Sequence, residues 1–265
     1  MRDARDTARQ ITVAASAVIA VIGSFIGSGA AGGTPIQDAA GGALAADATL
    51  IAPAAPAFSI WSVIYLGLLA YAVWQFLPAQ SGAQRHRRIG YWVAASLVLN
   101  AAWILSIQFD LLPLSVPIIA VLLAVLLRIL LELTASPSTS RLDAVITDGS
   151  LGLYLGWVTI ATAANVTAWL VASGFTGFGW PPELWSVLVI VAAAAAGVAI
   201  AIAGRGRIAP ALSLSWGLAW VAVGRLTGEP ASTVTAVAAI AAVVVVLGSA
   251  ALLRARRRDA VRSRA

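Results

Sequence analysis

Eight stretches of about 20 apolar residues follow one another along this chain of 265 residues. A stretch of that length crosses the hydrocarbon core of a bilayer as an α-helix, because a helix satisfies its own backbone hydrogen bonds where water is absent. The predicted spans are Ile11–Ala30, Pro56–Leu77, Ile89–Phe109, Leu112–Thr134, Thr147–Ser173, Leu184–Ala203, Ala209–Leu226 and Thr233–Leu253. We therefore predict an all-α, polytopic membrane bundle with eight transmembrane helices.

The distribution of charge between the predicted loops supports this count. Only 11% of the residues are charged, whereas a soluble domain carries about 25%. With the N-terminus in the cytoplasm, the inner side holds Arg2, Arg5, Arg9, Arg85, Arg87, Arg88, Arg128, Arg141, Arg205, Arg207, Arg254, Arg256, Arg257, Arg258, Arg262 and Arg264. The outer side holds Asp38, Asp47, Asp110, Glu183 and Glu229, with Arg225 as its one arginine. Since arginine is enriched in cytoplasmic loops, the pattern predicts a multi-pass plasma-membrane protein with both termini inside.

The composition also limits the chemistry. The chain has no cysteine, which excludes disulfides and thiolate metal sites, and no lysine, which excludes Schiff-base chemistry. The one histidine, His86, lies in a run of arginines and is expected to be solvated. We find no catalytic constellation, metal-ligand cluster or phosphate loop, and expect neither an enzyme nor a cofactor. The net charge of +6 is a topology signal, so no nucleic-acid partner is expected.

Three segments outside the predicted spans carry further expectations. The N-terminal arginines followed by an apolar run also resemble a signal peptide, although we expect the first span to be retained. The outer loop Ala31–Pro53 is long enough to form a lid over the bundle, or to be a loop without a role. The basic tail, residues 254–265, is predicted to lack regular structure and to lie against anionic lipid headgroups.

Polar and aromatic side chains at mid-span need a reason beyond contact with lipid. At 1.5 Å of rise per residue, Trp157 of the fifth span lies near the middle of the membrane. Aromatic walls with a few polar groups are the usual lining of a ligand pocket, and packing among themselves is the alternative. The residues predicted to line a pocket are Trp61, Tyr65, Asn100, Trp103, Trp157, Ala161 and Asn165.

Some of these side chains have structural explanations as well. Asn100 and Asn165 are expected to face inward, where each either links two helices or binds a ligand. Arg225 is expected either to pair with Glu229 or to contact a ligand anion at the mouth of the pocket. The seventh span adds Trp216 and Trp220 to the same region. Three glycines are expected to let the fifth span pack closely against a neighbour: Gly149, Gly152 and Gly156.

Three motifs resemble those of the TspO/MBR family, the tryptophan-rich sensory proteins related to the mitochondrial translocator protein. The fifth span, Leu153-Tyr-Leu-Gly-Trp-Val-Thr-Ile-Ala-Thr-Ala-Ala-Asn165, is similar to the family's fifth helix. Phe58-Ser-Ile-Trp-Ser-Val-Ile-Tyr65 looks like its Trp-x-x-x-Tyr segment, and Leu99-Asn-Ala-Ala-Trp103 like its Leu-Asn-x-x-Trp segment. The resemblance covers roughly residues 10–175, so we predict a TspO-like five-helix bundle over 1–175 and three additional spans over 176–253.

The resemblance implies a bundle that binds hydrophobic ligands such as tetrapyrroles and, in some members, sterols. It implies that Trp61 and Trp157 line the site. The family's first loop usually carries aromatic residues that cover the ligand, but Ala31–Pro53 has none. The expected partners are such a ligand and the bilayer, and a homodimer stays open.

We therefore expect a ligand-binding membrane protein that senses or moves a small hydrophobic molecule. One alternative is a transporter of a small amphipathic solute, in which the last three spans complete a pathway. A less favoured alternative is an intramembrane lipid-modifying enzyme, for which only Asp110, Glu132 and Asp148 are candidate acid–base groups.

Overall fold

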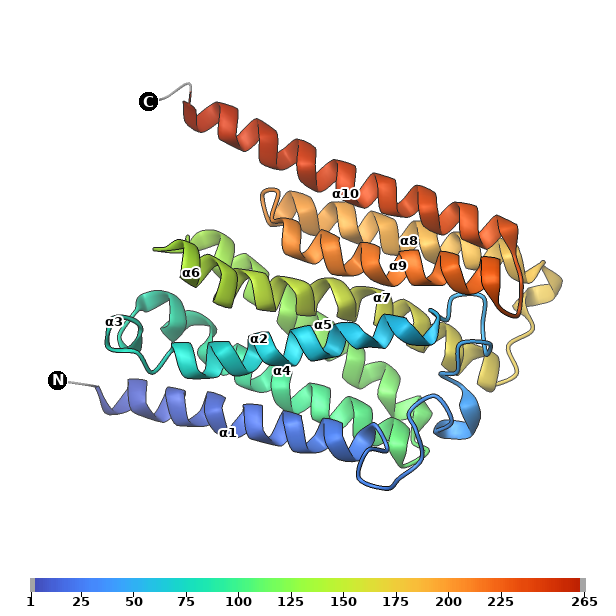
Figure 1. Cartoon of the computed structure of the whole chain (residues 1–265), viewed down its shortest axis with the longest axis horizontal. Coiled ribbons are helices and arrows are strands. Elements are labelled where there is room, and N and C mark those ends of the chain that lie inside the picture. The colour runs from blue at the N-terminus through green and yellow to red at the C-terminus, as the bar shows by residue number, and fades with distance from the viewer. Residues whose placement is uncertain (1–2, 263–265) are drawn as a thin grey trace.

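Long antiparallel helices make up the protein, and the computed structural model describes residues 3–262 (Figure 1). The helices are α1 (Ala4–Gly27), α2 (Ile60–Trp74), α3 (Pro78–Ser81), α4 (Gln84–Gln108), α5 (Leu112–Ala135), α6 (Arg141–Asp143), α7 (Ser150–Ala172), α8 (Pro182–Ala203), α9 (Ile208–Thr227) and α10 (Thr233–Arg262). Short helical turns add η1 (Ala40–Gly42), η2 (Ala55–Ser59), the π-helical η3 (Ala144–Gly149) and η4 (Gly177–Gly179). The described residues contain no strand.

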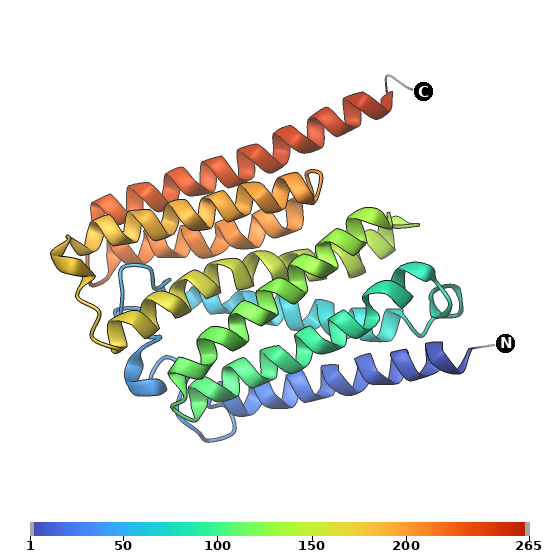
Figure 2. The same cartoon turned by 180° about the vertical axis from the view of Figure 1, so that it is seen from behind.

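Each of the eight predicted spans corresponds to a long helix. In the described part of the chain, seven helices are long and apolar enough to cross a membrane, which makes this a multi-pass membrane protein. The predicted seventh span is α9, which is 20 residues long but falls short of that apolar composition. Its serines, glycines and Arg225 lower its hydropathy. It nevertheless lies alongside α8 and α10 over its own length, and α10 extends beyond it (Figures 1 and 2).

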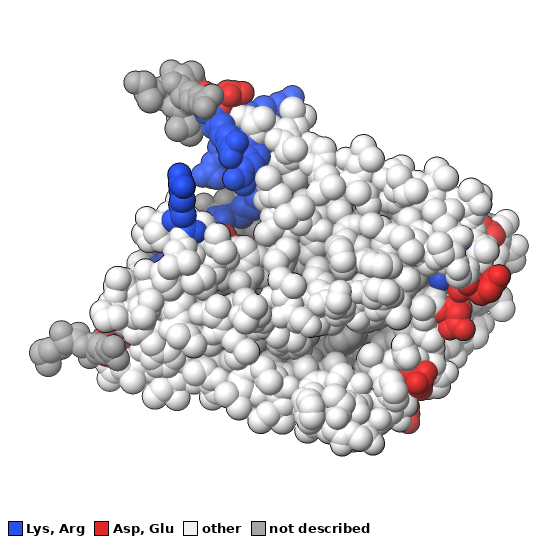
Figure 3. Space-filling view, in the orientation of Figure 1, with Lys and Arg blue, Asp and Glu red and all other residues white. Residues whose placement is uncertain are grey.

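Arginines and carboxylates gather at opposite ends of the molecule. Both ends of the described chain lie at one end of the bundle, where arginines cluster, and this is called the basic end (Figure 3). Carboxylates are prominent at the other, acidic end (Figure 3). Residues 1–2 and 263–265, which include Arg2 and Arg264, lie outside the described residues. The separation agrees with the charge asymmetry that the sequence predicts between loops.

The predicted boundaries were wrong at three places. The basic tail is helical as far as Arg262, because arginine and alanine favour helix and extend α10. The first helix begins at Ala4, seven residues earlier than predicted, because Arg9 reaches the carbonyl of Ser81 at 2.8 Å and is buried there. The predicted fifth span begins at Arg141, since α6, η3 and α7 run on as one helix.

Because this helix begins at Arg141, Asp148 lies within it and not at its start. The carboxylate lies inside a continuous helix and caps none. Its Oδ1 pairs with Arg85 of α4 at 2.5 Å and also with Arg207 at the start of α9. Arg207 donates a second hydrogen bond to the carbonyl of Leu133 at 2.7 Å. Asp148 and Arg207 together thus join α4, α5, η3 and α9 at the basic end.

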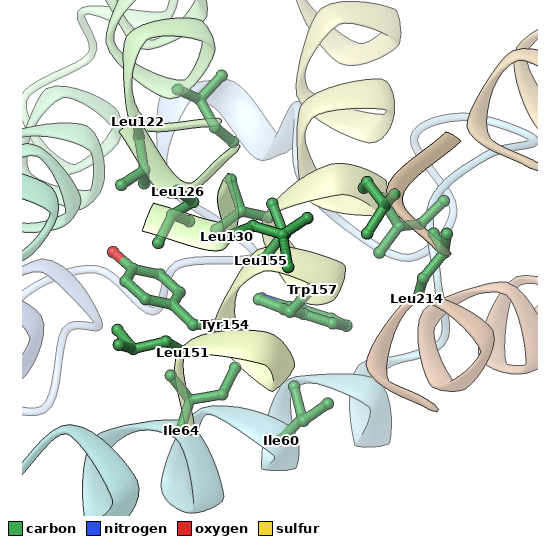
Figure 4. Packing of buried hydrophobic residues seen from close by; sticks show 14 of the residues in the cluster. Ile60, Ile64, Leu122, Leu126, Leu130, Leu151, Tyr154, Leu155, Trp157 and Leu214 are labelled. Atoms are coloured by element: carbon green, nitrogen blue, oxygen red, sulfur yellow. The ribbon is translucent and has the colours of Figure 1, made fainter. Parts of the chain in front are cut away.

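The middle of the bundle is α7. It lies between the group formed by α1, α2, α4 and α5 and the group formed by α8, α9 and α10 (Figures 1 and 2). From Ser150 to Ile160 every residue except Leu153 is buried, so the helix is covered on all sides. Figure 4 shows Leu151, Tyr154, Leu155 and Trp157 meeting side chains from α2, α5 and α9. A helix that is apolar all round is expected in such a position.

Two of the three predicted packing glycines lie where α7 touches α9. A Cβ at Gly152 would lie 2.8 Å from the Cβ of Ala209. A Cβ at Gly156 would overlap the carbonyl oxygen of Pro210 and the hydroxyl of Ser213. Gly149 has no such neighbour on another helix. The two helices can therefore approach closely only where the side chain is a hydrogen atom.

Replacing Gly156 with alanine should destabilise the bundle by roughly 1–3 kcal/mol, because the added methyl group forces α7 and α9 apart. The readout is the apparent melting temperature of the purified protein in detergent. Gly248→Ala is the matched control, since a Cβ there meets nothing within 4 Å. It should leave the melting temperature unchanged or raise it slightly, because alanine favours helix over glycine. Equal melting temperatures for the two variants would contradict the proposed close contact.

Candidate functional site

An aromatic cluster surrounds Trp157 where α2 meets α7. Trp157 is 2% exposed, and its ring lies edge-on to Phe58 at a centroid distance of 5.8 Å. Trp61 meets Trp157 edge-on at 6.2 Å and stacks on Tyr65 at 5.4 Å. Trp61 also meets Tyr154 at 6.1 Å. Edge-on and offset pairs of this kind are the favoured geometries for aromatic rings. They hold the three predicted aromatic residues of this region in fixed orientations.

Asn100 joins α4 to α2 behind this cluster. Its Nδ2 donates to the hydroxyl of Tyr65 at 2.5 Å, and that hydroxyl also contacts the hydroxyl of Ser24 on α1. The side chain is 1% exposed, so it faces inward as predicted. In this structure Asn100 is a link between helices.

Asn165 joins three helices. Its Oδ1 accepts a hydrogen bond from Nε1 of Trp103 at 3.0 Å, and its Nδ2 donates to the hydroxyl of Ser115 at 2.8 Å. Ser115 in turn donates to the carbonyl of Leu112 at 2.6 Å. The amide is 1% exposed and has partners on both sides, as a buried polar group requires. It holds α4, α5 and α7 together and fixes the indole of Trp103.

A cavity of about 40 Å³ lies next to Trp157 and Asn165. It is lined by Ala43, Leu44, Thr49, Ala52, Pro53, Phe58, Trp103, Trp157, Ile160, Ala161, Ala164, Asn165 and Ala168. Four of the seven predicted pocket residues are therefore brought together: Trp103, Trp157, Ala161 and Asn165. The other three, Trp61, Tyr65 and Asn100, do not line the cavity but lie in the clusters beside it.

The loop Ala31–Pro53 covers this cavity and is called the lid from here on. It contributes small and aliphatic lining residues, among them Ala43, Leu44 and Pro53. About 40 Å³ holds roughly one water molecule, whereas ligand pockets usually measure about 300–1,000 Å³. With the lid in this position, the cavity is too small for a ligand of that size.

Few polar contacts hold the lid down. The amide of Ala40 donates to Oδ1 of Asp110 at 3.0 Å. Just after the lid, the amide of Ala54 donates to the carbonyl of Trp220 at 3.2 Å. The strongest contact comes from Arg225 in the last turn of α9, whose Nη2 donates to the carbonyl of Ala46 at 2.6 Å. Opening therefore requires that a small number of hydrogen bonds break.

Arg225 is 1% exposed and does not line the cavity. Besides Ala46, it donates from Nη1 to the carbonyl of Pro230 at 2.8 Å. A cation in the last turn also interacts favourably with the helix dipole of α9. The predicted contact with a ligand anion stays a prediction, while the observed partners are backbone carbonyls of the lid and of the α9–α10 loop.

The two tryptophans of α9 support the lid from outside the cavity. Trp216 donates from Nε1 to the carbonyl of Ala57 at 2.9 Å. Trp220 lies edge-on to it at 5.7 Å and accepts from the amide of Ala54 through its carbonyl. Both fix the segment between the lid and α2.

Several lining residues were missed from the sequence. Ala164 and Ala168 follow the predicted Ala161 at helical spacing, and this stripe of small side chains was the available signal for empty space on α7. Two buried polar atoms near the predicted site have no hydrogen-bond partner: Nε1 of Trp157 and Oδ1 of Asn100. An unpaired buried indole N–H on a cavity-lining residue is a candidate donor to a ligand.

Each of the three candidate acid–base groups has a partner of its own. Asp110 lies at the acidic end and accepts from Ala40. Glu132 pairs with Arg128 at 2.5 Å, and Asp148 pairs with two arginines at the basic end. Within residues 3–262 there is no group of three or more side chains able to hold a metal ion. The site that the geometry does assemble is aromatic, amide-bearing and apolar.

A family model described as TSPO-like protein matches residues 13–251. The matched range begins inside α1 and ends inside α10. The match therefore continues past residue 175, where the segment with the motifs ends, and includes α8 and α9. No curated protein and no solved structure matches the chain.

Removing the Ser115 hydroxyl should lower the stability of the bundle by about 1–3 kcal/mol, because Nδ2 of Asn165 then loses its partner in a buried site. The measurement is thermal unfolding of Ser115→Ala. Ser249→Ala is the control, since that hydroxyl donates only to a carbonyl three residues earlier in its own helix. If both serine variants unfold at the same temperature, Asn165 does not depend on Ser115.

Proposed function

The chain belongs to the TSPO-like protein family, and from that membership we propose that it binds a flat hydrophobic ligand, such as a tetrapyrrole, beside Trp157. The observation that carries the proposal is the cavity between Trp157, Trp103 and Asn165, which the lid covers and which is lined by a tryptophan whose indole N–H has no partner. A binding function needs no acid–base pair, which agrees with the scattered carboxylates.

Ligand binding in this form requires the lid to withdraw. The cavity of about 40 Å³ must grow several-fold to hold a tetrapyrrole, and Leu44, Ala52 and Pro53 occupy the adjoining space. Because only open molecules bind, the apparent affinity falls by the fraction of molecules that are open. The aliphatic lid then replaces the aromatic cover that the first loop usually provides in the TspO/MBR family.

The proposed location is the plasma membrane, with the basic end in the cytoplasm. The argument is the positive-inside rule applied to loops whose arginines gather at one end of the bundle. In that orientation the lid faces the outer side, so a ligand reaches the cavity from there or from the outer leaflet.

Trp157→Phe and Trp61→Phe should each weaken binding of protoporphyrin IX roughly three- to tenfold, because each loses aromatic contact area and Trp157 also loses its N–H donor. Binding is followed by the absorbance change of the porphyrin on titration into purified protein. Trp92→Phe is the matched control, since Trp92 is 41% exposed on α4 and touches neither the cluster nor the cavity. If neither variant changes the binding of any flat hydrophobe, the site is assigned wrongly.

Arg225→Met should release the lid, because two hydrogen bonds from its guanidinium to backbone carbonyls are lost. We expect amide hydrogen exchange in residues 43–53 to become about tenfold faster and porphyrin association to accelerate, since a charged hydrogen bond contributes about 1.5–3 kcal/mol. Arg128→Met, which removes an exposed arginine at the basic end, should change neither.

The same variant tests the predicted anion contact. If Arg225 binds a ligand carboxylate, Arg225→Met weakens binding of protoporphyrin IX but not of its dimethyl ester. If it only holds the lid, both porphyrins respond alike. Thermal unfolding measured in parallel separates either result from general loss of the fold.

A further inference from the structure

A second and larger cavity opens at the acidic end, on the other side of the lid. Its volume is about 520 Å³, within the range of small-molecule sites. The end of α7, the α7–α8 connection, the start of α8, lid residues 48–51 and the α9–α10 loop surround it. It lies outside the aromatic cluster around Trp157, and the two cavities share only Thr49.

One wall of this second cavity is a fixed aromatic surface. Trp180 and Trp185 stack at a centroid distance of 5.6 Å with an interplanar angle of 27°. Phe175 lies edge-on to Trp185 at 5.5 Å. Nε1 of Trp185 donates to the carbonyl of Gly177 at 2.9 Å, which sets the orientation of the indole.

The tight turn at Gly177 is required for that wall. Its φ is +69°, a conformation that side chains disfavour, and a Cβ there would lie 2.8 Å from Nε1 of Trp185. The orientation of Trp185 is therefore set by the α7–α8 connection, while Trp180, which stacks on it, is 52% exposed.

Glu183 is the one ionisable residue that lines the cavity. It is half-buried in the first turn of α8, and none of the described arginines forms an ion pair with it. The nearby cation Arg225 lies within electrostatic reach of Asp47 and Glu229, so the two carboxylates more than offset its charge. The acidic end therefore presents a net negative environment to a molecule in the cavity.

We propose that this second cavity is a binding site for an amphipathic organic cation. The cationic group pairs with the carboxylate of Glu183 and lies against the faces of Trp180 and Trp185, whose electron-rich rings attract cations. The apolar body fills the space between Leu170, Val189 and Ile51. A carboxylate in the first turn stabilises α8, and tryptophans favour membrane interfaces. Neither effect accounts for the cavity that lies beside them.

The test uses two probes of nearly equal size and opposite charge, tetraphenylphosphonium and tetraphenylborate. Equilibrium binding of each is measured to the full chain reconstituted in lipid nanodiscs, with empty nanodiscs as background. We expect saturable binding of the phosphonium and at least tenfold weaker binding of the borate. Glu183→Gln should weaken phosphonium binding about tenfold, and Trp180→Leu about three- to tenfold.

Asp38→Asn is the matched control for charge, because it removes one exposed carboxylate at the same end. Asp38 lines neither cavity. It should leave phosphonium binding unchanged. Trp157→Phe should do the same, which distinguishes this site from the proposed tetrapyrrole site. The proposal is overturned if the borate binds as well as the phosphonium. It is also overturned if Glu183→Gln and Trp180→Leu bind the phosphonium like the unmodified chain, once thermal unfolding has shown that both variants are folded.

Discussion

The close contact between α7 and α9 is the constraint on which the arrangement of the bundle depends. At Gly156 the carbonyl of Pro210 lies where a side chain would otherwise be. This contact allows α7 to be covered from the side of α9 while α2 and α5 cover its other sides. With α7 in the centre, its residues line two different cavities. Trp157 and Ala161 line the first cavity, and Leu170 lines the second.

The lid shows how an apolar segment can close a site without aromatic residues. Its alanine, leucine and proline side chains fill space and contribute no hydrogen bonds of their own. The polar contacts come from the surrounding helices, through Asp110 and Arg225. A buried arginine that donates to backbone carbonyls is strongly held in place, because losing these hydrogen bonds would leave its desolvated charge uncompensated. The closed state therefore depends on α9, a helix outside the segment where the family motifs were noted.

Much of the architecture could be predicted from the sequence, because hydrophobic length and arginine position reflect the membrane directly. The inward orientation of Asn100 and Asn165 follows in the same way, since amides facing lipid are costly. The partners of Arg225 could not be predicted, because backbone carbonyls leave no mark in a sequence. The start of the fifth span at Arg141 could not be predicted, because the π-helical stretch η3 between α6 and α7 has no compositional signal.

Four residues that line the first cavity could be named from the sequence, but the volume of that cavity could not be predicted. Trp103, Trp157, Ala161 and Asn165 were recognisable by depth and by motif, and they do line one cavity. How far the lid fills that cavity depends on the path of a glycine- and alanine-rich loop, which sequence periodicity does not describe. The second cavity could not be predicted for a related reason. Trp180 and Trp185 have the composition and depth of an interfacial belt, and only the fold shows the space beside them.

Thr49 borders both cavities; its neighbours Ala48, Leu50 and Ile51 line the second cavity, and Ala43, Leu44, Ala52 and Pro53 line the first. A molecule that enters one cavity and moves this segment must change the free energy of binding in the other. Thermodynamic linkage makes that influence reciprocal: whatever factor one occupant imposes on the second, the second imposes on the first. If both proposed sites bind ligands, this segment of the lid is the part of the chain that couples them.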